Sequence, residues 1–234
     1  MDIGKAFSYV FEDEQWISKV LLGGVILLIP IVGWIAVSGY MVKVAQNVAQ
    51  GNPRPLPQWG EFGDHFMRGL YAFVIGLVYL IPVFVLEGLF FCVTGGLAAG
   101  ARRGEGAAAG LLGVCFVPLI FILSLGLTFV LYAALARYVA TNTMSEAFKF
   151  KEVIASVRTN FTPWLMLWLV SLLAGFVGGL GLIACGIGVL FTGFYSVCVQ
   201  GHALGQTVAQ QGMMGNPYAT QQMPPVNYEP PAMQ

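Results

Sequence analysis

Residues 164–199 read WLMLWLVSLLAGFVGGLGLIACGIGVLFTGFYSVCV, and this apolar run decides the fold. The run contains no charged side chain and is 36 residues long. About 20 residues of helix already cross the hydrocarbon core of a bilayer, so the run is too long for one crossing. Glycines gather at 178–181 and 185–188, where the backbone turns most easily. We therefore predict a helical hairpin in a membrane.

The composition of the whole chain also indicates a lipid environment. Hydrophobic residues make up 57% of the 234 residues and charged residues only 9%, and the mean hydropathy is +0.77. Soluble domains carry roughly 25% charged residues, so this chain has too few to cover a water-facing surface. The net charge is zero, and we expect no nucleic-acid partner.

Three further apolar runs precede the quoted one, at 16–42, 69–93 and 107–136. The first run is interrupted at 30–33 (PIVG). This interruption corresponds to the predicted turn at 185–188 (CGIG), because each is followed by a similar tripeptide, SGY at 38–40 and TGF at 192–194. This likeness favours a hairpin over one kinked span. The stretch at 94–106 is rich in small residues and predicts a loop. The predicted fold is all-α, with six transmembrane helices arranged as three hairpins.

A short amphipathic stretch precedes each hairpin. Each stretch predicts an interfacial helix lying on the membrane surface, with the polar start of the following span as the alternative. Thr143 and Glu146 predict a capping box for the third stretch. The apolar faces are Ile3, Phe7, Val10 and Phe11; Trp59, Phe62, Phe66 and Leu70; and Ala147, Phe150, Ile154, Val157 and Phe161.

The basic residues predict the orientation in the membrane. In the six-span arrangement, only Arg102 and Arg103 fall on the side opposite the N-terminus, and the other nine Lys and Arg residues share its side. By the positive-inside rule, both termini are expected in the cytoplasm. The expected organisation is a membrane domain at 1–205, with hairpin units at about 1–52, 53–140 and 141–205. A disordered cytoplasmic tail rich in Pro, Gln and Met follows at 206–234.

Residues able to carry chemistry are few, and we predict no catalytic residue, no cofactor and no metal site. The four cysteines are scattered singly at 92, 115, 185 and 198, and whether Cys92 pairs with Cys115 stays open. Glu87 is the one acidic residue inside an apolar span. A charge at mid-bilayer costs roughly 2.5–3.5 kcal/mol, so Glu87 is the candidate intramembrane polar site, with an interfacial role near Arg102 or Arg103 as the alternative.

Other residues fit packing and anchoring roles. Gly175 and Gly179 have the GxxxG spacing of helix contacts in membranes. Tryptophans near the predicted interfaces fit an aromatic belt: Trp16, Trp34, Trp59 and Trp164.

Three segments resemble a known family: DIGKAFSYVFEDEQW at 2–16, PIVG at 30–33 and GNPRPLP at 51–57. Together they are similar to the prokaryotic membrane proteins of the domain of unknown function 4013 family, over most of residues 1–205. The resemblance implies a polytopic membrane protein of a bacterium or archaeon, and it transfers no catalytic residue.

We therefore predict a non-enzymatic protein of a prokaryotic plasma membrane. It would act as a scaffold, assembly partner or bilayer-organising component, with lipid and other membrane proteins as partners through its surface helices or its tail. The alternative is a small transporter or channel with Glu87 as its titrating group. A membrane domain that assists a soluble lipid enzyme is a third hypothesis.

Overall fold

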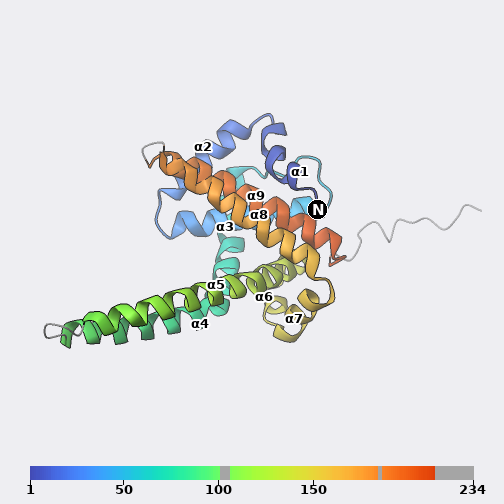
Figure 1. Cartoon of the computed structure of the whole chain (residues 1–234). Helices are drawn as coiled ribbons and strands as arrows, with labels where there is room; N and C mark the ends of the chain where they lie inside the picture. Colours follow the sequence, from blue (N-terminus) through green and yellow to red (C-terminus); the bar gives the residue numbers. More distant parts are fainter. Residues whose placement is uncertain (101–105, 184–185, 214–234) are drawn as a thin grey trace, which may run out of the picture.

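The computed structural model describes residues 1–100, 106–183 and 186–213. These residues form three helical hairpins: α2 (Trp16–Leu27) with α3 (Val32–Ala49), α4 (Phe62–Gly100) with α5 (Gly106–Thr141), and α8 (Phe161–Leu180) with α9 (Gly188–Gln210). Figure 1 shows the ends of α2, α4 and α8 on one side, at the left, and α1, α6 and α7 on the other. The shorter elements are α1 (Ile3–Ser8), η1 (Tyr9–Glu12), η2 (Trp59–Glu61), α6 (Met144–Ala147), α7 (Phe150–Thr159) and η3 (Gly181–Ile183).

The first apolar run folds as two helices, which confirms the predicted hairpin over a single kinked span. The break follows Leu27, and Ile31 has a positive φ of 64° with ψ −63°, the geometry of a γ-turn in which the Val32 amide donates to the Pro30 carbonyl at 2.7 Å. Pro30 cannot donate a helical hydrogen bond, which favours a turn at this position. The hairpin is short on one side, since α2 has 12 residues and rises only about 18 Å.

Within the described part of the chain, three helices are long and apolar enough to cross a membrane: Trp59–Gly96, Phe116–Thr141 and Phe161–Ile183. Their length and composition indicate a membrane location, where such helices contact lipid. The other three hairpin helices are either too short, as α2 is, or less apolar, as α3 and α9 are. The six-span arrangement therefore stays a prediction.

Several predicted boundaries were wrong. The second amphipathic stretch is not a separate surface helix, because after η2 it continues without a break into the 39 residues of α4. Residues 94–100 of the predicted loop belong to the same helix. The predicted tail starts too early, since α9 continues to Gln210 with Thr207 and Val208 buried. The capping box is absent, because the Thr143 side chain makes no capping hydrogen bond.

Helix α3 lies at the centre of the protein and packs against both α4 and α9. Glycines permit these crossings: a Cβ added at Gly69 would lie 1.7 Å from the carbonyl oxygen of Ile35, and one at Gly39 would lie 1.6 Å from that of His65. On α9, Gly205 approaches the Ala45 carbonyl in the same way. The backbones of the three helices are therefore in direct contact.

The outer half of the α4–α5 hairpin stands apart from this core, and we call it the arm (residues 84–100 of α4 and 106–124 of α5). Figure 1 shows it extending away from the other helices, with α4 changing direction near its middle. Pro82 lies at that point, where it lacks the amide that would bond the Val78 carbonyl, and such prolines kink helices.

Candidate functional site

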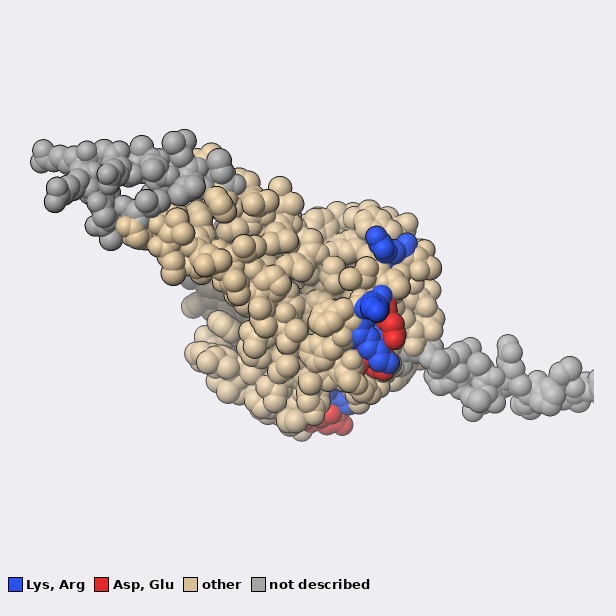
Figure 2. Space-filling view, turned by 90° about the horizontal axis from the view of Figure 1, so that it is seen from below, with Lys and Arg blue, Asp and Glu red and all other residues tan. Residues whose placement is uncertain are grey.

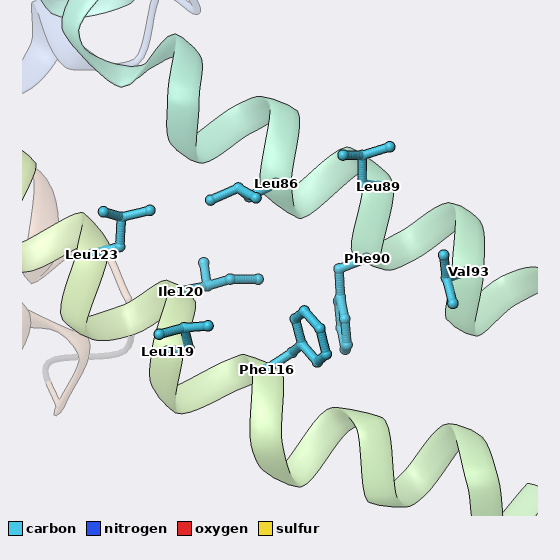
Figure 3. Close-up of a pocket in the computed structure, with 8 residues that line it drawn as sticks. All are labelled: Leu86, Leu89, Phe90, Val93, Phe116, Leu119, Ile120 and Leu123. Atoms are coloured by element: carbon cyan, nitrogen blue, oxygen red, sulfur yellow. The ribbon is translucent and has the colours of Figure 1, made fainter.

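The arm exposes large apolar side chains around both of its helices. A groove of about 210 Å³ runs between them, and Figure 3 shows side chains from α4 and α5 facing it. The most exposed apolar residues of the arm include Phe91 at 70% and Ile122 at 66%. In a membrane this surface faces lipid tails or another apolar helix. The groove is lined by Leu86, Leu89, Phe90, Val93, Phe116, Leu119, Ile120 and Leu123.

Glu87 lies on the arm, half-buried, at a second groove of about 250 Å³. Ser124 on α5 lines the same groove, and the remaining lining is apolar. The structure therefore brings one carboxyl and one hydroxyl group to a lipid-facing position. The predicted pairing of Glu87 with Arg102 or Arg103 lies outside the described residues.

A buried ion pair fixes the start of α2. The Lys19 ammonium lies 2.7 Å from the Asp13 carboxylate and donates a second hydrogen bond to the Leu56 carbonyl at 3.0 Å. Both charged side chains are less than 10% exposed. Trp59 donates its indole N–H to the Lys19 carbonyl. These contacts hold the N-terminal segment and the proline-rich bridge, residues 51–58, against one another.

Two polar cavities border this junction. One, of about 270 Å³, lies beside the Lys19 ion pair. The other, of about 420 Å³, lies between the N-terminal segment, the bridge and α9. At its edge Tyr9 stacks on His202 with ring centroids 4.3 Å apart, and the Tyr9 hydroxyl donates to the Cys198 carbonyl at 2.9 Å. Burial raises the pKa of Tyr9 well above its ordinary value, so its hydroxyl stays protonated.

A second polar network joins α3, α4 and α5 around Arg68. The guanidinium donates to Asp64 at 2.7 Å, to Gln46 at 2.6 Å and to Asn142 at 2.9 Å. The Gln46 amide donates in turn to the Asn142 side chain at 3.2 Å. The network satisfies a partly buried cation with local acceptors and therefore serves to join the three helices.

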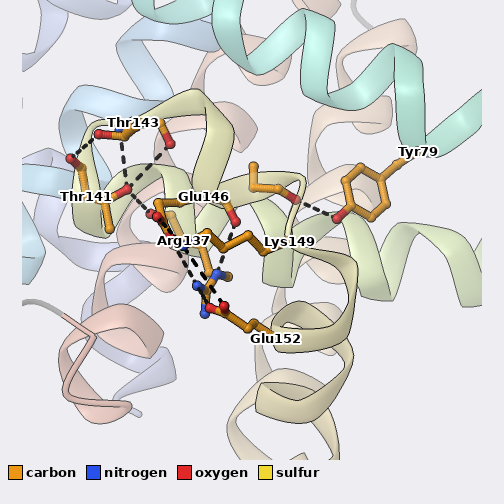
Figure 4. A network of polar contacts seen from close by, with 8 residues as sticks. Tyr79, Arg137, Thr141, Thr143, Glu146, Lys149 and Glu152 are labelled. Carbon is orange, nitrogen blue, oxygen red and sulfur yellow. Dashed lines mark hydrogen bonds and ion pairs between the residues drawn. The ribbon is translucent and has the colours of Figure 1, made fainter.

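A third network attaches α6 and α7 to the end of α5, as Figure 4 shows. Arg137 pairs with Glu146 at 2.9 Å and also with Glu152, while Lys149 pairs with Glu146 at 2.7 Å. The hydrogen bond from Lys149, followed by that from Arg137, lowers the pKa of Glu146. The Tyr79 hydroxyl on α4 donates to the Ala147 carbonyl at 2.6 Å. This network sets the position of α7 against the long hairpin.

The predicted tryptophan anchors occupy different environments. Trp34 is 63% exposed and Trp16 is half-buried, so both can reach a membrane interface. Trp59 and Trp164 are only 8% and 1% exposed, and their rings contact protein within this chain. Trp164 donates its indole N–H to the Ser156 carbonyl at the end of α7.

The predicted packing glycines face outward. Gly175 and Gly179 are exposed, and a Cβ at either would meet nothing within 4 Å. Gly178 and Gly181 are the buried glycines of this region, and they approach Ser196 and Thr192 on α9. A contact of the Gly175 and Gly179 face with a second chain stays a prediction.

The cysteines and histidines do not converge on a reactive site among the described residues. Cys198 is buried and Cys92 is exposed, both as free thiols. The side chain of Cys115 and the whole of Cys185 lie outside the described part of the chain. No group of three His, Cys, Asp or Glu side chains within the described ranges could hold a metal ion.

Sequence reasoning did not find the polar networks. The spacing of Asp64 and Arg68, four residues apart on one helix, was a local signal. The spacing of Lys149 with Glu146 and Glu152, three residues apart, was another. The Arg68 network has further partners that are distant in sequence. Gln46 and Asn142 come from segments more than 20 and 70 residues away. Nothing in those segments marks the two amides as partners of an arginine.

These features define an all-helical membrane protein with polar networks at one end and an apolar arm at the other. Residues 22–187 match the family described as "Protein of unknown function (DUF4013)". The match covers well over half of the chain, and the protein belongs to this family. It includes the 30–33 and 51–57 segments and leaves out 2–16. No curated protein and no solved structure matches the chain.

Proposed function

We propose that the protein is a non-enzymatic assembly partner in a prokaryotic plasma membrane, and that its arm is the surface that binds another membrane protein. The observation that carries this proposal is the exposure of large apolar side chains on both arm helices. Because lipid tails are as apolar as these side chains, association there would depend on shape, and the groove of about 210 Å³ offers such a shape.

The contrast between the arm and the central helices supports this assignment. The crossings of α3 with α4 and α9 are closed by glycine contacts, so that surface is already occupied within the chain. The arm helices contact mainly one another. An additional helix packing on the arm would therefore need no rearrangement of the core.

The proposed orientation has six spans, with both termini in the cytoplasm. The ion pairs between described residues, which exclude 101–105, all join side chains that the six-span arrangement assigns to the cytoplasmic side. On the face shown in Figure 2, charged side chains gather on the side of the body away from the arm. This separation supports a placement in which the charged side chains lie at one membrane surface and the arm lies among the lipid tails.

The alternative function, transport, has support from one groove. Glu87 and Ser124 line it together, and a carboxyl group in an apolar span is a frequent feature of proton pathways. Proton-coupled flux in proteoliposomes that is lost in Glu87→Gln would favour transport. Equal flux in both proteins, or none in the wild type, would remove this support.

Site-specific photo-crosslinking in native membranes tests the assembly proposal. A photoreactive phenylalanine analogue replaces Phe91 on the arm or Phe176 on α8, which are 70% and 69% exposed. We expect a discrete protein adduct from position 91 and not from 176. Ile120→Trp, which fills the groove, should abolish that adduct. Lipid adducts alone at position 91 would refute an arm-bound partner.

A further inference from the structure

Helix α7 and Phe161 at the start of α8 combine an exposed apolar stripe with cations that the Arg137 network does not neutralise. Phe150, Ile154 and Phe161 are 49%, 47% and 53% exposed. Next to the stripe, Val153 is fully buried and holds the helix against the protein. The stripe is therefore an outward surface with no covering element among the described residues.

The stripe packs against the long hairpin through its two phenylalanines. Phe150 lies against Tyr79 of α4, and Phe161 stacks on Phe129 of α5, each with ring centroids 5.2 Å apart. The ion pairs of Arg137 with Glu146 and Glu152 attach α7 close to Thr141, where the apolar span of α5 ends, and so place this helix at the end of the apolar belt. At that depth a bilayer presents its glycerol and phosphate groups.

The charges of this segment are unbalanced. Residues 137–161 contain four cations and two carboxylates. Arg137 and Lys149 bind both carboxylates. The other two cations, Lys151 and Arg158, are exposed and make no ion pair with a described residue. The segment therefore presents about two positive charges to its surroundings.

The helical positions of these cations suit contact with phosphate groups. At roughly 100° per residue, Lys151 and Arg158 lie within roughly 60° of Ile154 around the helix axis. Glu152 lies on the far side, at roughly 160° from Ile154, where Arg137 binds it. The cations thus flank the apolar stripe on its solvent side, and long basic side chains there can reach the phosphate level while the stripe enters lipid.

We propose that α7, together with Phe161 at the start of α8, is a binding surface for anionic phospholipid, with Phe150, Ile154 and Phe161 in the acyl region and Lys151 and Arg158 on the headgroup phosphates. The N-terminal amphipathic segment, residues 1–16, has the opposite balance, with four carboxylates against Lys5. The preference for anionic lipid therefore belongs to α7. This inference rests on the proposed membrane placement, and it adds the class of lipid that the charged end selects.

Native mass spectrometry of the full chain in mild detergent tests the proposal. The protein is titrated with phosphatidylglycerol or with phosphatidylcholine of the same acyl chains. Wild-type protein should bind phosphatidylglycerol more tightly, and added salt should reduce the difference because salt screens surface charge. Each cation near an anionic surface is worth roughly fivefold in affinity, so Lys151→Gln/Arg158→Gln should lose roughly 25-fold for phosphatidylglycerol. Binding of phosphatidylcholine should be unchanged, which also reports correct folding.

The matched control is Lys5→Gln/Arg54→Gln, which removes two exposed cations outside α7, one from the N-terminal segment and one from the proline-rich bridge. We expect it to change phosphatidylglycerol binding less than twofold. An equal loss in both double variants would mean that total charge, rather than α7, attracts the lipid. A wild-type protein without preference between the two lipids would also overturn the inference. Neither outcome would affect the crosslinking result at Phe91, so failure here is distinguishable from failure of the arm proposal.

Discussion

The crossing of α3 and α4 should not tolerate a single added methyl group at Gly69. A Cβ there would lie 1.7 Å from the Ile35 carbonyl oxygen, whereas a carbon and an oxygen in close contact need about 3.3 Å. The helices would have to separate by roughly 1.5 Å, because a backbone carbonyl cannot rotate away as a side chain does. Overpacking of this kind costs about 1–3 kcal/mol and occasionally more.

Gly76→Ala is the matched control on the same helix, since its added Cβ meets nothing within 4 Å. Both substitutions gain about 1 kcal/mol of helix propensity, so this gain cancels in the comparison. We expect Gly69→Ala to be less stable than Gly76→Ala by about 2 kcal/mol, which is roughly a 30-fold change in the unfolding equilibrium.

The buried thiol of Cys198 gives the assay. In a background where Cys92, Cys115 and Cys185 are serine, labelling of Cys198 requires the core to open, because this side chain is fully buried. Gly69→Ala should label roughly 30-fold faster than Gly76→Ala in the same detergent. Equal labelling rates would show that the two helices do not approach as closely as the structure describes.

Two further perturbations test the polar networks. Lys19→Met leaves the buried Asp13 carboxylate without its cation and should destabilise the protein by about 3 kcal/mol in the same thiol assay. Asp13→Leu/Lys19→Met, which removes both charges, should recover most of that loss. A double variant as unstable as the single one would contradict this expectation. The pKa of Glu146 is lowered by Lys149 and Arg137, so its contribution to stability is present above the ordinary carboxyl pKa and is lost as pH falls through the lowered value. A spin label on Ala155→Cys should therefore gain mobility in acid. In the Glu146→Gln variant the same label should already be mobile at neutral pH. Identical spectra at pH 7 for the labelled proteins with and without Glu146→Gln would exclude the network as the attachment of α7.

The hairpins could be predicted because their breaks are local. Pro30 and the glycines at 185–188 interrupt helix geometry wherever the rest of the chain lies, so the turns follow from the residues themselves. The continuous α4 could not be predicted in this way, because the small residues at 94–100 are compatible with either a loop or a helix.

The residues that form helix contacts were harder to identify, because the spacing of two glycines along a helix does not show which neighbour their face of the helix meets. Gly175 and Gly179 have the same spacing as Gly201 and Gly205. Only the second pair contacts a neighbouring helix, since α9 lies against α3 along that face. Trp59 and Trp164 likewise have the sequence context of interface anchors but are buried in the protein.

The sequence by itself determined the class of protein, because 9% charged residues and long apolar runs leave few structures other than helices in lipid. The tertiary structure decided which groups meet. It brought Arg68 to Gln46 and Asn142, Lys19 to Asp13 and the Leu56 carbonyl, and α7 to the side of α4 and α5. These contacts depend on how helices cross in space, which no pattern within a single helix specifies.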